Sequence, residues 1–315
     1  MSQEVSTART PVRHAHPIGL VAMIAAVLTF SASSTIIRKA GAPGPTIAFW
    51  RMLMSSAVWT LLLRIREGRW VALQELRRAI PTGVALGFNI LLFYTAATRT
   101  SVANVEFITA LAPLLLIPAG AILFHEKVDR RAAVFGLISI VGLALVLFDA
   151  PKRGAATWFG NGLAFLALST WSSYMLASRQ LRKGMSVATL MASALPIATV
   201  VTLPVVLISH DIGKFGARSM VYIVVLTLLT GVVAHGLIVF AQRKVPIGIM
   251  SMMQVGQPAL AVVWSAIFLS QSIRAVQILG MIMVVFGLAT VVVQTQRRTG
   301  KLIATENGEL AGSTG

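Results

Sequence analysis

The chain has 315 residues, of which 56% are hydrophobic and only 12% are charged, and its mean hydropathy is +0.81. A soluble domain is about 25% charged, so this composition excludes an ordinary soluble protein and indicates that lipid surrounds most of the chain. The lack of cysteine excludes disulfides and thiolate metal sites. The net charge of +17 is better explained by membrane orientation than by nucleic-acid binding, which we do not expect.

Apolar stretches of roughly twenty residues, each long enough to cross ~30 Å of hydrocarbon, recur along the chain and predict ten transmembrane helices. Helices are expected because backbone polar groups in lipid must pair within their own segment. The predicted spans are 17–37, 45–63, 80–98, 102–124, 132–149, 158–178, 187–208, 218–242, 247–270 and 275–294. The expected fold is therefore an all-α integral membrane protein.

The segments between the spans are short and leave no room for a soluble domain. Residues 1–16 and 296–315 are tails, and we expect the second to be disordered. The longest connection, 64–79, has Trp70 and Leu73 at helical spacing among charges. Both a short helix on the membrane surface and a solvated loop fit this pattern.

Basic residues predict the orientation in the membrane. With ten spans, both tails lie on the same side, and that side holds more than twice as many Lys and Arg residues as the other. An excess of positive charge marks the cytoplasmic side. We therefore expect a multi-pass protein of the plasma or inner membrane with both termini in the cytoplasm.

Two stretches, 102–129 and the run from Ile247, share their landmarks at a shift of 145 residues, which aligns Pro113 with Pro258. Further on, the same shift aligns Gly142 with Gly287. The sequence thus predicts two repeats of five helices, at 17–150 and 157–295. Because five is odd, the second repeat crosses in the opposite sense, an arrangement used by secondary transporters whose site lies near the membrane midplane.

Short motifs in both halves resemble those of drug/metabolite transporters with two EamA-type repeats. The motifs are Ala112-Pro113, Gln257-Pro258, Phe124-His125-Glu126, Phe49-Trp50-Arg51 and the glycine pairs Gly136/Gly142 and Gly280/Gly287. The resemblance covers nearly the whole chain and is greatest to YddG-type exporters of aromatic and other neutral amino acids. It implies a ten-helix exporter of such solutes. The second half departs from the pattern at Gln271, which stands where the first half has Glu126.

Polar residues one or two turns before each proline are candidates for binding substrate: Glu106 and Thr109 in the first half, Ser251 and Gln254 in the second. Glu106 is the only acidic residue clearly inside a predicted span, where a carboxylate is costly unless it faces a cavity or a partner. It would bind a substrate ammonium group or a proton. Alternatively, it reaches the outer interface, about one turn away.

Further polar residues lie close to the middle of predicted spans. Asn89 and His235 fall within one residue of equivalence under the repeat, and they suit either substrate binding or hydrogen bonds between helices. Gln254 and Gln257 are three residues apart, so they share a helix face, which we expect to be buried. Pro258, like Pro113 in the first half, removes a backbone donor, so each proline either kinks a helix for gating or only shapes packing.

Aromatic and hydroxyl residues occur together at equivalent places in the two halves, and they suit an amphipathic substrate. The set comprises Trp171, Ser172, Ser173 and Tyr174, their counterparts Thr29, Phe30, Ser31 and Ser33, and Phe88, Phe93 and Tyr94 in the third span. An interfacial aromatic belt is the alternative. Arg51 is a candidate to pair with a carboxyl group of the substrate or of the protein, and its place in a family-like motif favours a structural pair within the protein.

These features favour a secondary transporter that exports neutral or aromatic amino acids; a carrier of drugs, sugars or other metabolites is the alternative. A membrane-embedded transferase would need clustered acids or a nucleophile with its base, and the spans show no such set. We therefore expect no enzymatic activity, no cofactor and no metal. The expected partners are a small-molecule substrate and the lipid bilayer, and a monomer is compatible with the sequence.

Overall fold

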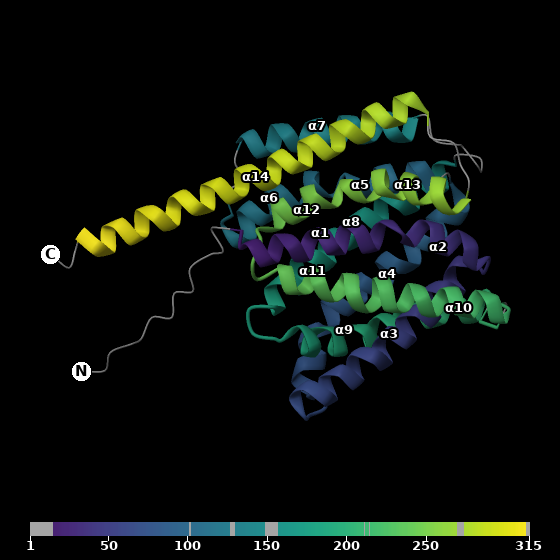
Figure 1. Cartoon of the computed structure of the whole chain (residues 1–315). Coiled ribbons are helices and arrows are strands. Elements are labelled where there is room, and N and C mark those ends of the chain that lie inside the picture. Colours follow the sequence, from purple (N-terminus) through teal and green to yellow (C-terminus); the bar gives the residue numbers. More distant parts are fainter. Residues whose placement is uncertain are drawn as a thin grey trace, which may run out of the picture.

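The computed structural model describes residues 15–100, 102–126, 130–148, 157–210, 212–213, 215–269 and 274–312. Within these ranges the chain is built of helices and contains no strand, which confirms the all-α fold class. The helices lie side by side in a bundle, and the last one extends well beyond it (Figure 1).

Most predicted spans correspond to one helix, and some to two or three consecutive helices. The helices are α1 (Pro17–Ser31), α2 (Ser33–Ala40), α3 (Gly44–Glu67), α4 (Leu73–Arg99), α5 (Val102–Ala110), α6 (Ala112–Phe124), α7 (Arg130–Phe148), α8 (Trp158–Leu181), α9 (Val187–Ile208), α10 (Ala217–Leu226), the π-helix η1 (Thr227–Ala234), α11 (His235–Ala241), α12 (Ile247–Gln254), α13 (Gly256–Leu269) and α14 (Ala275–Gly312).

Eight helical segments of the described chain are long and apolar enough to cross a membrane: Pro17–Ala40, Gly44–Glu67, Leu73–Ala97, Asn104–Phe124, Val187–Ile208, Ala217–Ala241, Ile247–Phe268 and Ala275–Gln294. A shorter apolar segment, Ala133–Leu147, lies in α7. Large apolar side chains such as Ile122 and Ile208 are 73% and 77% exposed, as expected of a surface that faces lipid. The chain is therefore a multi-pass membrane protein, and ten crossings remain a prediction.

Glycines allow the helices to approach closely. A Cβ atom on Gly280 would lie 2.5 Å from the carbonyl oxygen of Gly142, so α7 and α14 touch through their backbones. Gly83 and Gly87 allow a similarly close approach where α4 crosses α9, because a Cβ atom on either would lie within 3.0 Å of a backbone oxygen of α9. Small residues at helix contacts are typical of membrane proteins.

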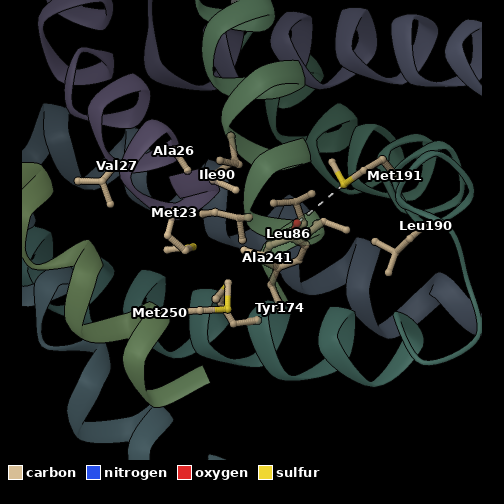
Figure 2. Close-up of a cluster of buried hydrophobic side chains, with 14 of the residues drawn as sticks. Met23, Ala26, Val27, Leu86, Ile90, Tyr174, Leu190, Met191, Ala241 and Met250 are labelled. Carbon is tan, nitrogen blue, oxygen red and sulfur yellow. Dashed lines mark hydrogen bonds between the residues drawn. The ribbon is translucent and has the colours of Figure 1, made fainter. Parts of the chain in front are cut away.

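The core lies between α1, α4, α8, α9, α11 and α12. Figure 2 shows part of it, where Met23, Leu86, Tyr174 and Met250 converge from four helices. These four side chains are at most 3% exposed and belong to one cluster of buried apolar residues. The methionines at the start of α12 therefore fill the core.

Two segments differ from the predictions. The chain from Gln296 was expected to be disordered, but α14 continues to Gly312 and projects from the bundle (Figure 1). The 64–79 connection is neither a surface helix nor a long loop: α3 runs to Glu67, Gly68 ends it at φ 68°, and α4 begins at Leu73.

The short turn between α3 and α4 is fixed by ion pairs. Arg69 binds the carboxylates of Glu67 and Glu75, each at 2.8 Å, and Glu75 also accepts a hydrogen bond from the backbone nitrogen of Ala72. Hydrogen bonding to Glu75 is the main cause that raises the pKa of the Arg69 guanidinium above its ordinary value. This turn holds the two helices antiparallel.

Candidate functional site

The two halves of the chain enclose one large cavity with an empty volume of about 850 Å³, including the space at its mouth. The first half contributes Phe30, Ser31, Ser33, Arg51, Asn89, Ile90, Phe93, Tyr94, Glu106, Thr109, Ala110 and Ala112. The second contributes Trp171, Thr230, His235, Ser251, Gln254, Gln257, Pro258 and Ala261.

The helices around the cavity are interrupted where they meet it. The break between α5 and α6 falls at Leu111, two residues before Pro113, and the break between α12 and α13 falls at Val255, three residues before Pro258. Because a proline lacks the backbone donor, the i→i−4 bonding cannot continue there. A third break, between α1 and α2 at Ala32, has no proline.

The structure brings most of the predicted site residues to this one cavity. Asn89, Tyr94, Glu106, Thr109, Trp171, His235, Ser251, Gln254 and Gln257 line it, as does Pro258. Tyr174 and Pro113 are buried behind the wall and do not line it. The Tyr174 side chain is fully buried, and its hydroxyl contacts the sulfur of Met191 at 3.9 Å (Figure 2).

Aromatic rings form one wall. Trp171 packs edge-on against Phe30, with 6.3 Å between ring centroids, and these are the residues that the repeat makes equivalent. His235 packs against Phe30 at 4.9 Å and against Trp171 at 6.0 Å. The indole nitrogen of Trp171 donates a 3.0 Å hydrogen bond to the side-chain oxygen of Gln254. This wall can hold a flat apolar group beside polar atoms.

Polar side chains line other parts of the cavity, between apolar residues such as Ile90 and Ala261. The Asn89 amide donates to the carbonyl of Ala167 at 2.9 Å, so it joins α4 to α8 as well as lining the cavity. Gln257 makes no side-chain hydrogen bond with any other residue in the described ranges, which leaves its amide available. Glu106 accepts a hydrogen bond from Ser34 and interacts electrostatically with Arg38.

The π-helix η1 places Thr230 against Arg51. Two carbonyl oxygens of this π-helix also have contacts with side chains. The indole of Trp59 donates to the carbonyl of Gly231 at 3.1 Å, and Nδ1 of His235 lies 2.6 Å from that of Thr230. Nε of Arg51 then donates to Oγ1 of Thr230 at 3.0 Å. The sequence favoured a carboxyl partner for Arg51, but it forms no ion pair within the described residues.

A second polar group closes the bundle at the end where α8 stops and α12 begins. Arg179 pairs with Glu126 and donates to the carbonyls of Gln242 and Val245, both at 2.7 Å. The other carboxylate oxygen of Glu126 accepts from the backbone nitrogen of Ile247 at 2.7 Å. Eight residues separate Arg179 from Trp171, which places it about 12 Å along the helix from the cavity wall.

Arg182 and Gln242 extend this group. Nε of Arg182 donates to the carbonyl of Val239 at 3.0 Å, and the Gln242 amide donates to the hydroxyl of Ser178 at 2.6 Å. Burial, with the nearby charge of Arg243, lowers the pKa of Arg182 to about 10, so it remains charged at neutral pH. We call Glu126, Arg179, Arg182 and Gln242 the ionic cluster.

A family model for EamA-like transporters matches the chain twice, at residues 17–148 and 158–293. The chain belongs to the EamA-like transporter family. This membership agrees with the sequence resemblance and with a bundle that surrounds a polar cavity, and it makes the chain a membrane transporter of the drug/metabolite superfamily.

The fold also occurs in a solved structure, the crystal structure of a protein, which superposes with a TM-score of 0.75 over 89% of this chain and 98% of its own. At 17% sequence identity, this likeness shows the fold alone. A comparison with curated proteins finds no match.

The sequence did not predict every residue of this cavity. Thr230 lies in an apolar run, and nothing in the sequence marks the π-helix that turns it toward Arg51. Phe88 was grouped with Phe93 and Tyr94, but it is 46% exposed and faces away from the cavity. Phe93 and Tyr94 follow Phe88 by five and six residues, so at about 100° per residue they lie about 140° and 120° away from it around the helix.

Proposed function

We propose that this chain is a secondary transporter that exports small amphipathic metabolites, neutral and aromatic amino acids in particular, by alternating access. The observation that carries the proposal is that polar and aromatic side chains from both halves converge on one cavity. Polar groups inside a membrane protein are costly and are typical of substrate pathways. A stacking wall, amides and a carboxylate beside one another suit a molecule with a ring and an ammonium group.

The packing of the helices supports two inverted five-helix repeats. Exchange of the halves pairs α3 with α9 and α7 with α14, and each of these helices packs against its own counterpart. The exchange also relates α4 to the segment formed by α10, η1 and α11, and it relates α8 to the segment formed by α1 and α2. The contact of α4 with α8 therefore predicts a contact between those two segments, and this contact is also present. A two-fold relation of this kind is used by transporters that rock one repeat against the other.

The distribution of charge supports the orientation. Basic residues concentrate on the side of the membrane that holds the two tails. We therefore place the protein in a plasma or inner membrane with both termini on the cytoplasmic side. In that orientation the ionic cluster closes the cytoplasmic end of the pathway. The cavity would then open outward in this state, and the breaks at Pro113 and Pro258 would serve as hinges for the opposite state.

In this mechanism the substrate ring stacks against Trp171 and Phe30. The amides of Gln254 and Gln257 hold its polar end, and Glu106 attracts its ammonium group. Opening the cytoplasmic end requires that the ion pair of Glu126 and Arg179 separate. Substrate binding would supply part of that free energy.

Flux measurements test the proposal. Labelled phenylalanine, methionine and threonine are loaded into liposomes that contain the purified protein, and their exit is followed against empty liposomes. We expect transport of phenylalanine at least. If none of the three moves, the amino-acid assignment fails, and the exit of labelled sugars and drug-like cations from liposomes prepared in the same way then distinguishes the other cargoes.

A further inference from the structure

Arg51 is a buried cation that forms no ion pair with any described residue. It lies in α3, lines the cavity and is only 1% exposed. Its Nη1 atom has no hydrogen-bond partner among the described residues. Its Nη2 atom lies 3.4 Å from Nδ1 of His235.

The contact with His235 does not satisfy Arg51. Nδ1 of His235 lies 2.6 Å from the carbonyl oxygen of Thr230, which carries no proton, so Nδ1 must be the donor in that contact. A protonated Nδ1 cannot also accept a hydrogen bond from Arg51. Both Nη atoms therefore lack an acceptor, and only Nε, bonded to Thr230, is satisfied.

Leaving a guanidinium buried and unpaired is expensive, which argues for a partner that the protein itself does not supply. The carboxylate that lines the same cavity, Glu106, forms no ion pair with Arg51; its own contacts are with Ser34 and Arg38. The free edge with two nitrogens matches the two oxygens of a carboxylate, a geometry that arginine binds in a bidentate manner.

We infer that Arg51 binds the carboxylate group of the transported solute, an inference that rests on the proposed function for the identity of the site. It makes Arg51 a specificity-determining residue: the cargo is a monocarboxylate, and with Glu106 on the same cavity it is a zwitterion. Arg51 and Glu106 line the cavity, so the carboxylate and the ammonium group of a zwitterion each have a side chain of opposite charge there. A phosphate dianion has no ammonium group for Glu106 to bind, although arginine also binds phosphate.

Binding to the purified full-length protein tests this inference. Calorimetric titrations compare phenylalanine with phenylalaninamide, which lacks the carboxylate, with 3-phenylpropionate, which lacks the ammonium group, and with inorganic phosphate. We expect the wild type to bind phenylalanine about 10- to 100-fold more tightly than its amide. In Arg51→Gln we expect this preference to disappear, because the affinity for phenylalanine falls to the affinity for the amide. Arg51→Lys should retain part of the preference.

Arg66→Gln is the matched control, since this exposed arginine lies near the end of the same helix. The wild-type comparison of acid with amide needs no variant, so it holds even if Arg51→Gln fails to fold. The inference is overturned if the wild type binds the amide as well as phenylalanine, if phosphate binds best, if none of the four binds, or if Arg51→Gln weakens acid and amide equally. If phenylalanine binds as expected but is not transported in liposomes, the proposed function is wrong and the inference about the carboxylate site stands.

Discussion

The carboxylate of Glu126 and the guanidinium of Arg179 form an ion pair almost completely withdrawn from solvent, with 2% and 5% of their side chains exposed. Arg179 comes from α8 and Glu126 from the residues that follow α6, so the pair joins the two halves of the chain. The backbone nitrogen of Ile247, at the start of α12, binds the same carboxylate. Three helices of the bundle thus meet at one charge pair.

Glu126→Gln removes the negative charge but keeps the size and one acceptor oxygen. Because Arg179 is then left buried without its counter-charge, we expect the free energy of unfolding to fall by about 3–5 kcal/mol. Chemical denaturation of the purified protein in detergent measures the change. Glu75→Gln is the control: it weakens an ion pair that is partly exposed on both sides, and it should cost less than about 1 kcal/mol. Equal losses in the two variants would contradict a special role for burial.

Gln257→Ala should lower the initial rate of phenylalanine efflux about two- to tenfold, because it removes an amide that no described residue engages and that faces the cavity. The melting temperature should remain close to that of the wild type. Gln74→Ala, at an exposed position of α4, is the matched control and should change neither quantity. Normal efflux in Gln257→Ala would remove this residue from the site.

The sequence predicted the helical fold and most of the cavity because both depend on local chemistry. The side chains of Glu106, Asn89 and Gln254 are costly to place in lipid. Their occurrence within apolar spans therefore already indicates that they face the interior of the protein. The breaks near Pro113 and Pro258 follow from a missing backbone donor. These inferences need only the residue and its neighbours along the chain.

What could not be predicted depends on contacts between distant segments. The helix break at Ala32 contains neither proline nor glycine, and the π-helix from Thr227 lies in an ordinary apolar run. Tyr174 shows the same sequence features as Trp171 and shares its helix face. It nevertheless lies one turn deeper, where its hydroxyl contacts Met191 of α9. That Arg51 lacks a carboxylate partner likewise emerges only when all the helices are in place.

The contact between Ser55 and Gly231 predicts a compensating pair of substitutions. A Cβ atom on Gly231 would lie 2.1 Å from Oγ of Ser55 but 3.3 Å from its Cβ. Gly231→Ala should therefore destabilise the protein by about 1–3 kcal/mol, and adding Ser55→Ala should restore most of the loss. Ser55→Ala alone should be nearly neutral, because its buried hydroxyl has no hydrogen-bond partner among the described residues. Additive effects in a double-mutant cycle would show that the two positions do not touch.

The backbone contact between α7 and α14 predicts a strong effect at Gly280. Alanine there would bring its Cβ to 2.5 Å from the carbonyl of Gly142, so the helices must separate. We expect Gly280→Ala to lower the free energy of unfolding by about 1–3 kcal/mol. Gly162→Ala on α8 meets no atom within 4 Å and should be neutral or slightly stabilising, because alanine favours the helix. A neutral Gly280→Ala would mean that this helix pair is loosely packed.

Two exposed tryptophans test the inverted arrangement of the halves. Trp70 precedes α4 and is 66% exposed, and Trp158 begins α8 and is 90% exposed. Thr157 donates a 2.6 Å hydrogen bond to the carbonyl of Arg99, so Trp158 lies at the opposite end of α4, which is about 40 Å long.

The chain has no cysteine, so Trp70→Cys and Trp158→Cys each introduce a single thiol. In intact cells a membrane-impermeant maleimide should label the thiol at 158 and reach the thiol at 70 only after the membrane is opened. The wild type should stay unlabelled throughout. Labelling of both thiols from outside would mean that the second half does not begin on the side opposite to the first, and the proposed exchange of the two halves about the cavity would then be ruled out.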